Sequence, residues 1–408
     1  MKISRLDIAP IRCGGLLLAI LAFFTMGLIY TNSQASDETT IYTVQKAILP
    51  VWIKDQKIRA GYLYFYNDTS KISEIKKSGL NMIIVKAWQF HEKQTHQTLL
   101  RFKRWGEACY RHDLHMLAAY NWQPQGVVLA KFRPAVFSDG SEATFVCPLD
   151  RNFWEMHMSE IGGHIAQLSL KKGLSIDGVL IDLEMYGTEK LPNNRRNYSD
   201  ETCYCDVCFS DYIAEKSLNS NIVAVDRRYR ASFLKRNSLY EDYHDYIAGM
   251  LNNYARHYRA ALHSINPQLF LGVYPYTTQP NWVIEGMARA FGTPENPVLL
   301  YAVDTYYKGG YKNIPERYEE KLEELGINGL YVPGYLFRKY SSSMINENIV
   351  KSLEKSDGYW LFKIPQLWYN YTDKNEKLAN GSQREYWDSI CDANKKSGKD
   401  PIEINTTQ

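Results

Sequence analysis

Strand-like and helix-like segments alternate along almost the whole chain, and this alternation restricts the fold more than any other feature. Eight short apolar segments each precede a stretch in which apolar residues recur at helical spacing. The predicted strands are residues 59–66, 81–88, 115–122, 175–184, 269–276, 298–305, 328–335 and 358–362. The predicted helices lie near residues 70–78, 98–112, 152–172, 226–265, 281–291, 314–325, 342–355 and 381–395. Strands that alternate with helices form parallel sheets, and eight such units predict an α/β protein with a (β/α)8 TIM barrel.

One barrel domain is predicted over residues 58–397, after a leader at 36–57 and before a tail at 398–408. The chain of 408 residues is longer than the ~250 residues typical of this fold. The surplus is predicted to form long loops after the third and fourth strands. An open doubly wound sheet is the structural alternative, although no glycine-rich phosphate loop follows the first strand.

Residues 1–35 have the pattern of a signal peptide. Basic residues precede an apolar run over residues 14–30, and the small-x-small tripeptide Ser33-Gln34-Ala35 follows it. The apolar run is close to the shortest length that spans a bilayer, so an uncleaved membrane anchor is the alternative. The sequence therefore predicts an exported protein, secreted or periplasmic, with no membrane contact beyond an N-terminal anchor.

The charge of the chain argues against a nucleic-acid partner. The formal net charge is +3, and without residues 1–35 the chain keeps 45 basic and 44 acidic residues with no basic block. Aromatic residues are frequent instead, with 31 Tyr, 9 Trp and 15 Phe. Flat rings stack on the apolar faces of pyranose rings, so this composition favours a carbohydrate ligand.

The predicted fourth strand ends in two carboxylates, Asp182 and Glu184. Strand side chains alternate between faces, so both point the same way, with Cβ atoms roughly 6–7 Å apart. Acidic residues are costly in a core, and two of them at the end of an apolar strand indicate acid/base chemistry. The structural alternative is a pair of strand-end acids held in salt bridges to nearby Arg residues.

Barrel active sites lie at the carboxyl ends of the strands. The predicted ends carry aromatic residues and a few acids but almost no Lys or His, which favours an oligo- or polysaccharide over a phosphate ligand. The candidate substrate-binding residues are Trp88, Asn121, Trp122, Tyr186, Tyr274, Tyr276, Tyr306 and Trp360. Trp122 and Trp360 are the best candidates for stacking on a sugar because they end strands.

The pattern Asp177-Gly178-x-x-x-Asp182-x-Glu184 resembles the fourth-strand signature of glycoside hydrolase family 18, the chitinases and endo-N-acetylglucosaminidases. This resemblance implies that Glu184 is the general acid. It also implies that Asp182 orients an N-acetyl group of the substrate, which itself attacks the anomeric carbon. The chain departs from the family pattern at Leu180, where that family has a further Asp.

A second resemblance is to the β-galactosidases of glycoside hydrolase family 42. It rests on Glu184-Met185-Tyr186-Gly187, followed by the Cys-x-Cys-x-x-Cys of Cys203, Cys205 and Cys208. With Cys147 from the loop after the third strand, the resemblance implies a structural zinc site of four thiolates. A disulfide among these cysteines is the alternative in an exported chain.

Both resemblances place the proton donor on Glu184, but they differ in the nucleophile. The segment 330–335 lacks the seventh-strand Glu of the second family, so a pair of carboxylates would need Asp304, Asp182 or Glu285 as its second member. Substrate assistance needs only one acid and a helper. The sequence thus predicts an exported glycoside hydrolase without a catalytic cofactor. The alternatives are a retaining β-glycosidase with two carboxylates and a non-catalytic, lectin-like barrel.

Overall fold

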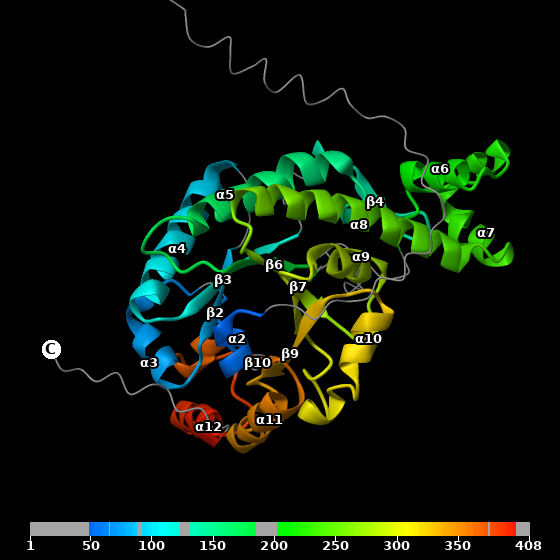
Figure 1. Ribbon diagram of the computed structural model, residues 1–408. Coiled ribbons are helices and arrows are strands. Elements are labelled where there is room, and N and C mark those ends of the chain that lie inside the picture. Colours follow the sequence, from blue (N-terminus) through cyan, green and yellow to red (C-terminus); the bar gives the residue numbers. More distant parts are fainter. Residues whose placement is uncertain are drawn as a thin grey trace, which may run out of the picture. The chain divides into compact units, whose positions relative to one another are not determined.

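Eight parallel strands close into a barrel in the computed structural model, which describes residues 49–64, 66–87, 92–122, 131–184, 202–373 and 376–396 (Figure 1). Around the barrel the strands follow the order of the chain, and the last pairs with the first. They are β1 (Ile58–Tyr62), β2 (Met82–Ala87), β3 (His115–Asn121), β6 (Gly178–Asp182), β7 (Phe270–Tyr276), β8 (Val298–Ala302), β9 (Gly329–Leu336) and β10 (Gly358–Phe362). The predicted (β/α)8 TIM barrel is confirmed. The predicted signal peptide, most of the predicted leader and the predicted tail lie outside the described residues.

Helices follow the strands along the chain and lie around the outside of the barrel in Figure 1, except α2, which precedes β1 and is drawn over the middle of the barrel. They are α2 (Val51–Gln56), α3 (Ile72–Lys77), α4 (Glu92–Arg111), α5 (Ser159–Ser169), α6 (Asp206–Glu215), α7 (Arg230–Arg236), α8 (Tyr240–Ile265), α9 (Trp282–Phe291), α10 (Tyr318–Glu324), α11 (Ser342–Lys355) and α12 (Gln383–Lys396). The single helix predicted near 226–265 is wrong: it divides into α7 and α8, because Ser238 adopts a left-handed conformation (φ 57°) that a helix cannot contain.

The alternation of strand side chains separates two apolar cores. One fills the interior of the barrel and includes Tyr62 of β1, Leu180 of β6 and Trp360 of β10. The other, called the outer core below, lies between the strands and the helices. It includes the sequence neighbours of the interior residues, such as Ile181 and Tyr359. The strand position of a residue therefore decides whether its side chain lies inside the barrel.

One helix, one hairpin and one further helix are among the elements that were not predicted. Helix α2, within the predicted leader, packs Ile53 into the interior core and stacks Trp52 on His115 at the start of β3 (ring centroids 3.8 Å apart). The other two belong to the predicted long loops: the hairpin of β4 (Pro134–Val136) and β5 (Glu142–Val146) after β3, and α6 after β6.

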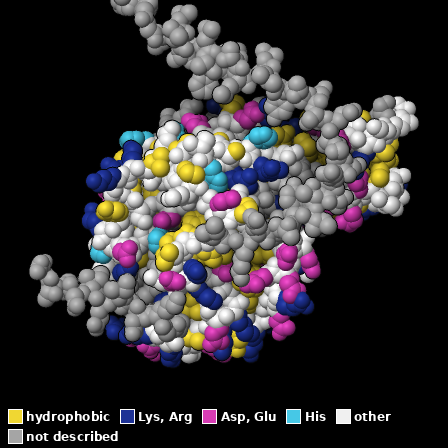
Figure 2. Space-filling model, viewed as in Figure 1, with side chains coloured by type: hydrophobic (Ala, Val, Ile, Leu, Met, Phe, Trp, Pro, Cys, Tyr) yellow, Lys and Arg dark blue, Asp and Glu magenta, His cyan; other side chains and the backbone are white. Residues whose placement is uncertain are grey.

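The face drawn in Figure 2 is mixed in charge and also carries scattered hydrophobic side chains. Lys and Arg side chains are interspersed with Asp and Glu over the face drawn in Figure 2. Within the described ranges, no helix combines the length and apolarity needed to cross a bilayer.

Candidate active site at the carboxyl end of the barrel

Asp182 and Glu184 lie at the carboxyl end of β6. Leu180 belongs to the interior core, so alternation points Asp182, two residues on, into the same space, where it is 1 % exposed. Glu184 follows the strand and is partly exposed. Its backbone N–H donates to Asp182 Oδ1 at 2.9 Å. Asp182 therefore fixes the backbone that carries the Glu184 carboxyl group.

Lys86, near the end of β2, forms a buried ion pair with Asp182. Its ammonium donates to Asp182 Oδ2, and the two side chains are 6 % and 0 % exposed. Met82 and Ile84 belong to the interior core, so the period of two places Lys86 there as well. The expectation that the strand ends carry almost no Lys is wrong here. Lys86 lies within an otherwise apolar strand, and its partner Asp182 belongs to β6, two strands away around the barrel.

Tyrosines line the space beside this ion pair. Tyr62, Tyr274 and Tyr306 belong to the interior core, and the Tyr306 hydroxyl donates to that of Tyr274 at 3.4 Å. Burial, then the nearby Tyr306, Glu184 and Asp182, raise the pKa of Tyr274 far above its ordinary value. Trp360 lies beneath them, fully buried, with its ring centroid 5.2 Å from those of Tyr274 and Tyr306. The Tyr274 phenol therefore remains a protonated hydrogen-bond donor across the physiological pH range.

A second ion pair, between Lys363 and Glu376, lies near the ring of Tyr64, which follows β1. The Lys363 ammonium is 2.8 Å from Glu376 Oε2 and 5.0 Å from the Tyr64 ring centroid. The Lys86 ammonium is 5.5 Å from the same centroid. Neither Lys363 nor Glu376 was predicted as a site residue, because both follow the end of β10.

Asp304, which follows β8, is held by hydrogen bonds to Tyr331 and Thr278. Asp304 Oδ2 accepts from the Tyr331 hydroxyl at 2.9 Å and from the backbone N–H of Thr278 at 3.2 Å. Tyr331 belongs to the core between strands and helices. Burial raises the pKa of Asp304, against the hydrogen bonds that lower it. Its catalytic role stays a prediction.

The other predicted ligand-binding residues divide between the two cores. Asn121 is paired in register with Asp182, whereas Trp122 lies in the outer core with its ring 4.9 Å from those of Phe153 and Trp154. Tyr276 is also in the outer core, because the pairing register shifts between Val273 and Tyr276. Trp88 and Tyr186 lie outside the described residues.

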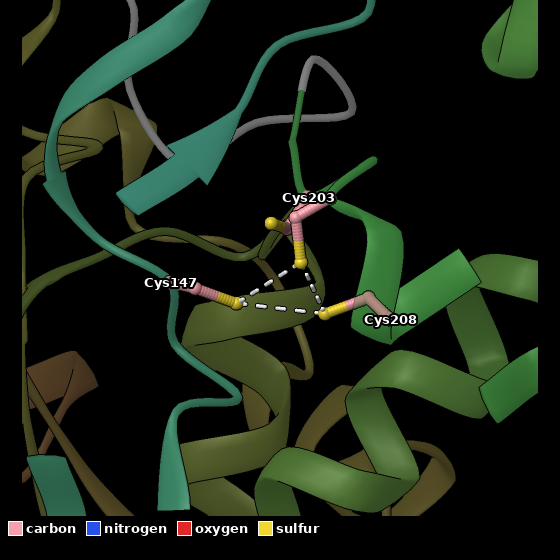
Figure 3. Close-up of side chains that lie close together, drawn as sticks. Cys147, Cys203 and Cys208 are labelled. Atoms are coloured by element: carbon pink, nitrogen blue, oxygen red, sulfur yellow. Dashed lines mark hydrogen bonds between the residues drawn. The ribbon is translucent and has the colours of Figure 1, made fainter. Parts of the chain in front are cut away.

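Four buried cysteines form a separate cluster in the insertions after β3 and β6. The sulfur atoms of Cys147, Cys203, Cys205 and Cys208 all lie within 4.8 Å of one another, and none is in a disulfide. The separations include 3.5 Å for Cys147–Cys208, 3.3 Å for Cys205–Cys208 and 3.9 Å for Cys147–Cys205. Figure 3 shows the sulfurs of Cys147, Cys203 and Cys208 pointing toward one another. This arrangement could hold a metal ion.

The chain around the cluster is held by surrounding elements. The backbone N–H of Tyr204 donates to Val136 O of β4 at 2.9 Å, and the Arg230 guanidinium of α7 donates to Tyr204 O at 2.8 Å. The Trp282 indole of α9 donates to Thr202 O at 2.7 Å. The cluster thereby connects the two insertions to each other and to helices on the outside of the barrel.

Removing Lys86 is expected to destabilise the protein through Asp182. Lys86→Met would leave a buried carboxylate without its cation, at a cost of about 3–5 kcal/mol in the free energy of unfolding. The double variant with Asp182→Asn should recover much of this loss, because the unpaired charge is gone. Denaturant unfolding of the two single variants and the double variant measures the coupling. Lys363→Met, whose partner Glu376 is 27 % exposed, is the matched control and should lose less; equal losses would contradict the assignment.

Comparison with known proteins supports the barrel fold. No family model and no curated protein matches the sequence. Among solved structures, the catalytic domain of a β-amylase from Paenibacillus polymyxa is similar, with a TM-score of 0.51 and 11 % identity over 83 % of this chain and 98 % of that one. A β-galactosidase from the psychrophilic Marinomonas ef1 has a TM-score of 0.50 and 9 % identity, over 82 % of this chain but only 58 % of that one. The resemblance to barrel glycosidases is thereby supported at the level of the fold.

Proposed function

We propose that this protein is an exported glycoside hydrolase that cleaves an oligo- or polysaccharide with Glu184 as the general acid. The observation that carries the proposal is the partly exposed Glu184 beside the buried Lys86–Asp182 pair at the carboxyl end of β6. Barrel active sites lie at this end. The fold shared with a β-amylase and a β-galactosidase supports the same class of reaction. Export rests on the signal-peptide pattern of residues 1–35.

Asp182 has two roles in this proposal. Its Oδ1 holds the backbone of Glu184, and its Oδ2 receives the Lys86 ammonium. Each carboxylate oxygen can still accept a second hydrogen bond. Asp182 can therefore also accept from the N–H of a substrate acetamido group, whose carbonyl oxygen then attacks the anomeric carbon. Glu184 gives its proton to the oxygen of the departing sugar.

A mechanism with two carboxylates is the second candidate, and the position of the Glu376 carboxylate near the candidate site favours it. Asp304 is engaged by Tyr331 and Thr278, and Glu285 is paired with Arg289 of α9 at 2.6 Å. Glu376 is also paired, with Lys363 at 2.8 Å, but this lysine lies 5.0 Å from the ring centroid of Tyr64, beside the candidate site. The Glu376 carboxylate acts with those of Asp182 and Glu184 to raise the pKa of Tyr64, after the larger effect of burial.

The four cysteines are proposed to bind a structural zinc ion. A tetrahedral Zn–S₄ site with bonds of about 2.3 Å has sulfur atoms about 3.8 Å apart. Three of the sulfur–sulfur distances in the structure, 3.3, 3.5 and 3.9 Å, lie close to this value. Four protein ligands leave no open position, so bound zinc would hold the two insertions together and take no part in hydrolysis.

The first experiment is a screen of the mature chain on a glycan array and on chromogenic glycosides. We expect release of sugar, and faster release from N-acetylhexosaminides if the acetamido group is the nucleophile. Asp182→Asn should then lower turnover of acetamido substrates by a factor of about 10² or more. Turnover of substrates without an acetamido group would favour the mechanism with two carboxylates. Binding without release of sugar would show a lectin-like protein and overturn the proposal.

A further inference from the structure

Tyr62 occupies a central position in the interior core beneath the candidate active site. It is the last residue of β1, is 1 % exposed, and has its ring centroid 5.3 Å from Phe362, 5.9 Å from Trp360 and 6.2 Å from Tyr274. Phe362 is partly exposed, as is Tyr64, whose ring centroid lies 6.3 Å from that of Tyr62. The phenol therefore lies one layer below the rim of the barrel.

The hydroxyl group of Tyr62 is buried and has no hydrogen-bond partner in the described structure. Several other buried tyrosines have a partner, although the hydroxyl of Tyr276, in the core between strands and helices, also has none. Tyr120 and Tyr258 bond to each other at 2.7 Å, and the Tyr301 hydroxyl, also inside the barrel, donates to Met82 Sδ at 3.1 Å. A buried hydroxyl without a partner destabilises the fold, and a phenylalanine would fill the same space without that cost.

The charges near Tyr62 belong to the candidate catalytic groups. Burial raises the pKa of Tyr62 well above its ordinary value, and the carboxylates of Asp182 and Glu184 raise it further. The group therefore stays a neutral donor while the site works. Geometry connects the phenol to the same site, because its ring packs against Tyr274, which is paired in register with Asp182. A buried, unpartnered donor in this position is available to a ligand.

We infer that the Tyr62 hydroxyl donates a hydrogen bond to a hydroxyl oxygen of the sugar unit that binds at Glu184. The inference rests on the proposed function, because the ligand is the sugar whose glycosidic bond Glu184 would protonate. Sugar hydroxyls both accept and donate. One that accepts from Tyr62 can donate to the neighbouring Asp182 carboxylate, so the two protein groups would fix a single hydroxyl from opposite sides.

The test is Tyr62→Phe, with Tyr301→Phe as the matched control. Both replacements keep a ring inside the barrel and remove one hydroxyl, but the Tyr301 hydroxyl is directed at Met82. We expect Tyr62→Phe to keep or raise the melting temperature while kcat/KM on the best glycan of the screen falls about tenfold. In the Glu184→Gln background it should weaken binding of the same glycan about tenfold. Tyr301→Phe should leave kcat/KM unchanged.

The outcomes separate this inference from the proposed function. If the wild type cleaves the glycan and Tyr62→Phe has the same kcat/KM, the inference fails and the proposed function stands. A lower melting temperature for Tyr62→Phe with unchanged binding also overturns it, since the hydroxyl then serves the fold. If the wild type cleaves no glycan, the proposed function fails, and the inference fails with it.

Discussion

Glu184→Gln is expected to lose glycan hydrolysis while it keeps the barrel fold and binds glycan. The amide has nearly the shape of the carboxyl group but cannot give up a proton to the departing sugar. The backbone N–H that bonds Asp182 Oδ1 is unchanged by the replacement. General acid catalysis contributes a factor of about 10²–10⁴, so kcat on natural glycans should fall by that factor or more.

Leaving-group dependence distinguishes loss of an acid from general damage to the site. A glycoside whose phenol leaves easily needs little protonation, so Glu184→Gln should cleave a dinitrophenyl glycoside much closer to the wild-type rate than it cleaves a natural glycan. Glu285→Gln, which removes a carboxylate paired with Arg289 on α9, is the control and should behave like wild type. Hydrolysis of natural glycans at the wild-type rate by Glu184→Gln would contradict the assignment of the acid.

The barrel was predictable because its strands are apolar and short and are separated by amphipathic helices. Residues 358–362 match β10, and residues 342–355 match α11, where the Ser341 side chain accepts from the backbone N–H of Met344 as an N-cap. The elements inside the long insertions were not predictable in this way. In the hairpin, β4 has only three residues, and β5 (Glu-Ala-Thr-Phe-Val) is not a continuous apolar segment like the barrel strands.

The candidate site was only partly predictable, because sequence order does not reveal which carboxylate a lysine will meet. Asp182 and Glu184 were visible as acids at the end of an apolar strand. Lys86 could not be identified in this way, because it lies 96 residues before Asp182 in the chain and meets it only inside the closed barrel. Tyr276 was predicted to bind substrate but lies in the outer core, because the pairing register of β7 shifts before this residue. Alternation predicts which face a side chain occupies only while the register is regular.

Removing metal is expected to lower the thermal stability of the protein sharply. Zinc bound by four thiolates contributes a binding free energy on the order of 10 kcal/mol to folding, because the unfolded chain does not present the site. The ion would join Cys147, after the β4–β5 hairpin, to Cys203, Cys205 and Cys208 at the start of α6. Prolonged chelation of the wild type, or Cys208→Ser, should therefore lower the melting temperature by about 10 °C or more.

Metal analysis and thiol chemistry decide between zinc and a disulfide. We expect one zinc per chain in the wild type and much less in Cys208→Ser. Cys391→Ser, which removes a half-buried thiol outside the cluster, should keep both the zinc and the melting temperature. A metal-free protein whose mass under denaturing, non-reducing conditions shows paired cysteines would overturn the zinc proposal. The active-site assignment would survive that result, because Glu184 and the Lys86–Asp182 pair share no ligand with the four cysteines.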